Sequence, residues 1–203
     1  MSQTLKLLEN YKCAGWLGFI AAFLLIPITS LSFYLRFSHA FENHQDMSLT
    51  WGFVSLSVIY LTVFSLIMLT FKTLLNQRVQ TSSFNVLIYM MIGLNIVLTL
   101  TDLTGFIVTE HMDTLSSVAI ISMIPYGIIN IIIGIKLLKL DHNLFEWKTS
   151  FAVLTIIGGA SLMLIFIGPL ALLTSFISFI ILSNIFFNAA KKSTSEDALT
   201  SVT

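Results

Sequence analysis

Apolar residues in this chain form long continuous runs, with no short alternating patterns typical of strands. Four runs stand out, each bounded by a short polar segment: 14–35, 51–75, 84–108 and 115–138. About 20 apolar residues are enough for a helix to cross a hydrocarbon core roughly 30 Å thick. The pattern therefore predicts four membrane-spanning helices in these ranges.

A fifth apolar stretch, 151–190, is about twice as long as a single crossing requires. Gly168 and Pro169 lie together near its middle. Proline lacks a backbone donor and restricts the residue before it, whereas glycine permits unusual turns. We therefore predict two helices, 151–167 and 169–188, joined by a tight hairpin. One long kinked helix is the alternative.

The composition favours the same interpretation. Of the 203 residues, 56% are hydrophobic and only 10% are charged, whereas soluble domains carry about 25% charged residues. Too few polar side chains are present to cover a soluble particle, so lipid must be the main solvent. We expect one all-α domain over 1–190, followed by a disordered polar cytoplasmic tail over 191–203.

The distribution of positive charge predicts the orientation. Lys and Arg concentrate in cytoplasmic loops. With six spans and a cytoplasmic N-terminus, Arg36 is the only one of the ten Lys and Arg residues on the outer side. With five spans, Lys191 and Lys192 would join it there. We therefore favour six spans, with both termini in the cytoplasm, and expect a multi-pass protein of a bacterial inner membrane.

Several kinds of chemistry are disfavoured by what the sequence lacks. All four histidines fall in predicted loops, which makes paired haem ligands inside the bundle improbable. The single cysteine excludes an intrachain disulfide and a CxxC redox pair. Neither a GxxxxGK[ST] phosphate loop nor an HExxH zinc motif is present. We therefore expect that the protein is not an enzyme and binds no cofactor. Its net charge of zero gives no reason to expect a nucleic-acid partner.

The predicted outer loops contain weak candidates for a metal site, namely His39, Glu42, His44 and His111. Imidazole and carboxylate groups bind several transition metals. Their spacing matches no defined site, however, and short polar loops need hydrophilic residues in any case. We favour solvated loops over a metal site.

Polar residues in the third run form a stripe. Asn95, Thr99 and Asp102 share one helical face because they are spaced by four and seven residues. Asp102 lies roughly 9 Å below the outer boundary at 1.5 Å per residue, and acids inside membranes are functional candidates by default. Three interpretations remain: an ion pair with Arg36, the wall of a water-filled vestibule, or a helix that ends near residue 102.

Asn130 in the fourth run is most simply an amide that bonds between helices. Pro27 and Pro125 each follow isoleucine, near the middle of the first helix of a three-helix half. Broken helices at corresponding positions of inverted repeats mark transporter binding sites. The two prolines are therefore predicted helix breaks and a hint of an inverted repeat.

Small residues form two faces suited to close helix packing. One consists of Ala14, Gly18 and Ala22, and the other of 158–161. Small residues let the backbones of membrane helices approach closely. Either face could pack within this chain or against another membrane subunit.

The leading functional hypothesis is a small permease or channel-like protein for a small solute or ion. Its pathway would include Asn95, Thr99, Asp102 and Asn130. The alternative is a non-catalytic subunit, scaffold or assembly factor that binds other membrane subunits through its small-residue faces. The third hypothesis is a membrane enzyme that binds a metal ion on its outer face. The expected partners are the lipid bilayer and either a second copy, in a homodimer, or other membrane subunits.

Overall fold

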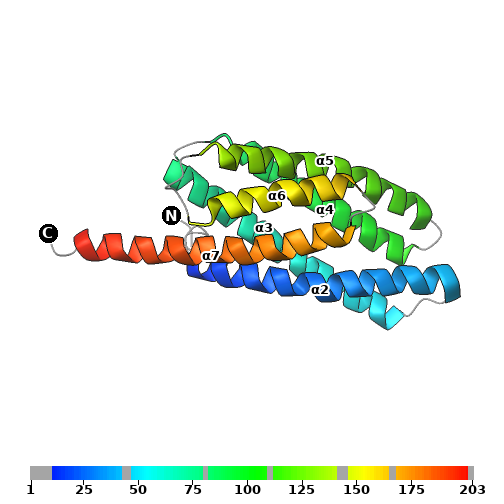
Figure 1. Cartoon of the computed structure of the whole chain (residues 1–203). Helices are drawn as coiled ribbons and strands as arrows, with labels where there is room; N and C mark the ends of the chain where they lie inside the picture. The colour runs from blue at the N-terminus through cyan, green and yellow to red at the C-terminus, as the bar shows by residue number, and fades with distance from the viewer. Residues whose placement is uncertain are drawn as a thin grey trace.

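The computed structural model of the chain describes residues 11–42, 47–79, 82–108, 112–140, 146–164 and 168–200. All regular secondary structure in these ranges is helical (Figure 1). The helices are α2 (Tyr11–Glu42), α3 (Met47–Val79), α4 (Asn85–Ile107), α5 (Met112–Leu138), α6 (Lys148–Met163) and α7 (Gly168–Thr200). All except α6 include a stretch long and apolar enough to cross a membrane. The prediction of an all-α, multi-pass membrane protein is confirmed.

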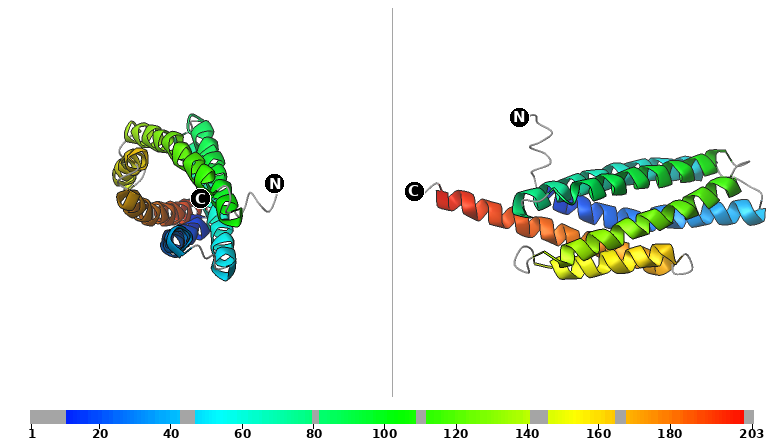
Figure 2. Two further views of the ribbon diagram at one scale, coloured as in Figure 1. Left: turned by 90° about the vertical axis from the view of Figure 1, so that its right-hand side faces the viewer. Right: turned by 90° about the horizontal axis from the view of Figure 1, so that it is seen from above.

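The six helices that the structure describes form a closed ring. Each helix packs against the next one in the chain, and α7 returns to pack against α2. Viewed along the bundle, the helices follow one another around a central axis (Figure 2). Side chains from helices that are distant in sequence can therefore meet near this axis.

Lysines gather at one end of the ring, which we call the basic end. The Lys72 Nζ donates to the Tyr89 hydroxyl at 2.6 Å. The Lys136 Nζ donates to the carbonyl of Ser83 at 3.1 Å, and Lys148 is buried at the same end. These contacts link α3 and α5 to the start of α4.

The outer surface of the ring is apolar. Large hydrophobic side chains from every helix are exposed there, including Phe23, Ile59, Tyr89, Ile121 and Leu173. Such a surface suits lipid, because acyl chains offer no hydrogen bonds to polar groups. The interior holds a core that includes the fully buried Phe71 and Phe186.

Helices α5 and α6 approach each other through glycine. A Cβ atom added to Gly159 would lie 2.5 Å from the Gly127 carbonyl oxygen, and one on Gly134 would lie 2.7 Å from the Ala152 carbonyl oxygen. Only residues without a Cβ allow backbones to come this close. The predicted packing face at 158–161 is therefore confirmed: Gly159 packs against α5, whereas Gly158 faces Thr174 of α7.

The other small-residue face packs α2 against α7. Ala14 and Ala22 are buried, and a Cβ atom on Gly18 would lie 2.2 Å from the Ser183 Oγ. This face is also confirmed as a packing surface. Both small-residue faces are thus occupied by helices of the same chain.

Proline does not break the first or fourth predicted span. Helices α2 and α5 continue through Pro27 and Pro125, and both side chains are exposed. The predicted helix breaks at these two residues are wrong, because membrane helices tolerate proline when the freed backbone groups find other partners. The structural basis for the inverted-repeat hint is lost with them.

The fifth apolar stretch does contain two helices. Helix α6 ends at Met163 and α7 begins at Gly168, and the two helices pack side by side. The chain therefore reverses between them, which excludes one long kinked helix. Pro169 lies in the first turn of α7, where a missing backbone N–H removes no helical hydrogen bond.

Helix α7 extends beyond the ends of the other helices (Figure 1). Its backbone remains helical to Thr200, so the prediction of disorder from residue 191 is wrong for residues 191–200. Residues 189–200 contain neither glycine nor proline, and lengthening an existing helix requires no new nucleation. Residues 201–203 lie outside the described ranges.

Candidate functional site

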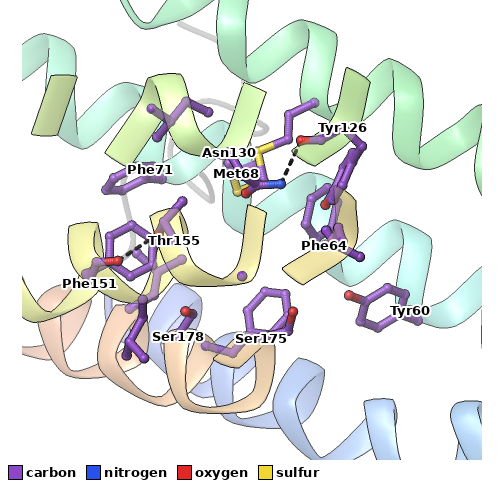
Figure 3. Close-up of a pocket in the computed structure, with 17 residues that line it drawn as sticks. Tyr60, Phe64, Met68, Phe71, Tyr126, Asn130, Phe151, Thr155, Ser175 and Ser178 are labelled. Atoms are coloured by element: carbon purple, nitrogen blue, oxygen red, sulfur yellow. Dashed lines mark hydrogen bonds between the residues drawn. The ribbon is translucent and has the colours of Figure 1, made fainter. Parts of the chain in front are cut away.

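A cavity of about 80 Å³ lies inside the ring (Figure 3). Every described helix except α2 contributes to its wall. The lining residues are Tyr60, Phe64, Met68, Phe71, Met91, Tyr126, Asn130, Ile133, Phe151, Leu154, Thr155, Gly158, Leu162, Ser175, Ser178, Phe179 and Leu182. Residues from five helices therefore converge on one internal space.

Aromatic contacts bound this cavity. Phe71 of α3 and Phe151 of α6 pack edge to face, with ring centroids 5.5 Å apart. Phe179 of α7 packs in the same way against Tyr60 and Phe64, at 6.3 and 6.2 Å. In Figure 3 the first pair lies at one end of the cavity, and Tyr60 and Phe64 lie at the other. Edge-to-face packing of this kind is favourable and gives the walls defined positions.

Three hydroxyl groups in the cavity wall have no hydrogen-bond partner within the described part of the chain: those of Tyr60, Ser175 and Ser178. Elsewhere in the bundle, serine and threonine commonly donate to the carbonyl four residues earlier. Thr155 donates in this way to Phe151 at 2.7 Å, and Ser183 to Phe179 at 2.8 Å. The three cavity hydroxyls remain able to donate to and accept from a solute.

Two asparagines support the polar side of the cavity. The Asn130 Nδ2 donates to the Tyr126 carbonyl at 2.9 Å. The Asn95 Nδ2 donates to the Tyr126 hydroxyl at 3.5 Å, and the Thr99 hydroxyl donates to the Asn95 Oδ1 at 3.4 Å. Asn130 lines the cavity, whereas Asn95 contacts the lining residue Tyr126. The Tyr126 hydroxyl is therefore already engaged by an asparagine, unlike the hydroxyls of Tyr60, Ser175 and Ser178.

Asp102 belongs to a different part of the structure. Its Oδ1 lies 2.8 Å from the Arg36 Nη2, and the two side chains are 32% and 38% exposed. The guanidinium group also lies over the Phe106 ring, 5.3 Å from its centroid. The ion-pair interpretation of Asp102 is confirmed. Asp102 does not line the cavity, so a structural role replaces its predicted role in a pathway.

Breaking this ion pair should destabilise the protein. We expect Arg36→Leu or Asp102→Leu alone to lower the free energy of unfolding by about 1–2 kcal/mol, between the values typical of exposed and buried ion pairs. The double variant should lose less than the sum, because neither charge is then left unpaired. Unfolding by SDS titration of the four proteins measures this coupling. Strictly additive losses would show that the contact contributes nothing.

The weak metal candidates are not brought together by the part of the structure that is described. His39 lies in the last turn of α2, while the side chains of Glu42, His44 and His111 fall outside the described residues. No group of three potential metal ligands occurs among the described side chains. The solvated-loop interpretation stays a prediction.

Sequence reasoning identified Asn95 and Asn130 but missed Tyr60, Tyr126, Ser175 and Ser178. A weak signal existed, because Ser175 and Ser178 share a helical face, as do Tyr126 and Asn130. The chain matches no known protein family, no curated protein and no solved structure. Function therefore has to be inferred from the geometry of the cavity.

Proposed function

We propose that the protein is a small permease and that the central cavity is its solute-binding site. The observation that carries this proposal is the set of hydroxyls of Tyr60, Ser175 and Ser178, which face the cavity without a partner in the described chain. All three side chains are half-buried, and a hydroxyl group that lines a cavity without a partner can bond to a solute there. A space of about 80 Å³ is large enough for several water molecules or a small solute.

The solute is uncharged. None of the described residues that line the cavity is acidic or basic. A charge moved from water into such surroundings would lack a compensating partner, which is costly. This narrows the original hypothesis of a small solute or ion to a small neutral solute.

The competing role as a scaffold has less support from the packing. Gly18 contacts α7, and Gly159 contacts α5. The faces expected to bind other subunits are therefore used within the chain.

The proposed setting is a bacterial inner membrane, with the basic end and both termini on the cytoplasmic side.

Transport by reconstituted protein tests this proposal. Liposomes that contain the protein should swell faster than empty liposomes in gradients of urea or acetamide. Glycine, a zwitterion, and chloride should show no such acceleration, because the cavity offers no charge to pair with them. Unchanged urea and acetamide rates with correctly inserted protein would refute the permease. Equal acceleration for glycine or chloride would refute the restriction to neutral solutes.

A further inference from the structure

Two lysines flank the start of α4 at the basic end of the ring. Lys72 of α3 contacts it from one side and Lys136 of α5 from the other. We propose that these two lysines and the exposed apolar face of α4 bind one anionic phospholipid, with its head group at the lysines and an acyl chain along the helix. Neither lysine lines the central cavity, so this site is separate from the proposed solute site.

Contacts with α4 and the residues just before it hold both ammonium groups in place. The Lys72 Nζ donates to the Tyr89 hydroxyl at 2.6 Å and lies 4.6 Å from the centroid of the same ring. The Lys136 Nζ donates to the Ser83 carbonyl at 3.1 Å and lies 5.8 Å from the Phe84 ring centroid. An ammonium group has three donors, and each of these hydrogen bonds uses one. Both lysines therefore keep donors for an anion, and their neutral partners leave the positive charges uncompensated.

The carboxylates of the described residues are engaged elsewhere. Asp102 pairs with Arg36 near the opposite end of α4, and Glu146 accepts from Asn188. Neither Lys72 nor Lys136 forms an ion pair within the described part of the chain. No side chain caps the start of α4, so the positive end of the helix dipole adds to the two charges. This complementarity favours an anionic partner.

The adjoining face of α4 suits an acyl chain. Val86, Met90 and Val97 share one helical face and are 66%, 50% and 45% exposed. Gly93 lies between them on this face, and a Cβ atom added there would meet nothing within 4 Å. From Val86 to Val97 the face rises about 16 Å, which is close to half of a hydrocarbon core roughly 30 Å thick. A chain that starts at the lysines can therefore follow α4 through one leaflet.

Tyr89 connects the charged part of this site to the apolar part. Its hydroxyl binds Lys72, and the side chain is 54% exposed. Tyrosine is typical of the boundary between lipid and water, and basic pockets between membrane helices bind anionic lipid head groups. A soluble phosphate ester would meet the lysines but leave the apolar face uncovered. A phospholipid occupies both surfaces, so we assign the site to a lipid.

Native mass spectrometry of the protein in detergent tests the proposal. Phosphatidylglycerol and phosphatidylcholine with identical acyl chains are titrated separately. Each lysine should strengthen binding of the anionic head about fivefold, so the first phosphatidylglycerol should bind about twentyfold more tightly than the first phosphatidylcholine. Equal affinities would overturn the proposal. An equal concentration of glycerol 3-phosphate should not displace the lipid, and displacement would overturn the assignment to a lipid.

Matched variants separate this site from a general attraction to the basic end. Lys72→Gln and Lys136→Gln should each weaken phosphatidylglycerol binding about fivefold, and the double variant should bind both lipids alike. Lys191→Gln is the control, because it removes an exposed charge from α7, which packs against α6 and α2 on the other side of the ring from α4. The control should bind phosphatidylglycerol like the unmodified protein. An equal loss in Lys191→Gln would overturn the assignment to α4.

A variant that carries both Lys72→Arg and Lys136→Arg separates charge from folding. It should keep the preference for phosphatidylglycerol, because guanidinium groups also pair with phosphate. Thermal unfolding without added lipid checks that every variant is folded. Loss of the preference in both the arginine and the glutamine double variants would overturn the proposal. Proteoliposomes that take up no solute would refute the permease and leave the lipid site standing.

Discussion

Replacing Gly159 with alanine is expected to lower the free energy of unfolding by about 1–3 kcal/mol or more. The added Cβ would lie 2.5 Å from the Gly127 carbonyl oxygen, and Gly127→Ala would place a Cβ 2.6 Å from the Gly159 carbonyl oxygen. These neighbours are backbone atoms, which cannot rotate away as a flexible side chain can. Relief requires α5 and α6 to separate along their whole contact.

Gly93→Ala is the matched control for this prediction. Gly93 lies on the exposed side of α4, and a Cβ added there meets nothing within 4 Å. We expect no loss of stability, because alanine favours helix more than glycine does. Unfolding of the three proteins by SDS titration or by heating makes the comparison. Equal stability of Gly159→Ala and Gly93→Ala would show that the close backbone contact does not hold α5 and α6 together.

Filling the cavity should abolish transport without unfolding the protein. We expect Ser178→Phe to lower the uptake of urea and acetamide by at least about tenfold, because a phenyl ring would occupy much of a cavity of about 80 Å³. Part of the ring must displace neighbouring side chains at a cost of about 1–3 kcal/mol, so the thermal midpoint should fall by several degrees while the protein remains folded. Uptake into proteoliposomes and thermal unfolding are measured on the same preparation.

Leu173→Phe provides the control for this variant. Leu173 lies on the same helix with 54% of its surface exposed, so a phenyl ring there points away from the cavity. Its uptake should match that of the unmodified protein. Normal uptake by folded Ser178→Phe would contradict a route through the cavity, and equal loss in Leu173→Phe would show that the effect is not local.

The sequence predicted the helices because each requires a long apolar run, and such runs are unmistakable. It predicted their ends less well. Helix α2 covers Tyr11–Glu42 and α3 covers Met47–Val79, against predicted spans 14–35 and 51–75. Polar residues past the edge of an apolar run can continue the helix, so hydropathy marks the part in lipid and not the whole element.

The pair of Arg36 and Asp102 was also within reach of sequence reasoning. Charge distribution placed Arg36 alone on the outer side, and helical geometry placed Asp102 at a similar depth. Opposite charges near the same level of a membrane are strongly favoured to pair. The ion pair observed at 2.8 Å agrees with this reasoning.

The cavity was beyond sequence reasoning for a physical reason. Serine and tyrosine are ordinary in membrane helices, and Ser178 looks no different in sequence from Ser183. Ser183 donates to Phe179, whereas Ser178 faces the cavity without a partner in the described chain. The cavity around Ser178 is lined by residues of α3 to α7, whereas Ser183 packs against Gly18 of α2. The distinction therefore depends on which helices meet, and these contacts join residues that are distant in sequence.

A cysteine placed in the cavity wall tests the central claim most directly. In a Cys13→Ser background, Ser178→Cys provides a single thiol that a small neutral methanethiosulfonate can convert to a mixed disulfide. We predict that modification stops urea uptake by the proteoliposomes and that a reducing agent restores it. Complete modification of Ser178→Cys with unchanged uptake would contradict a solute route through the central cavity.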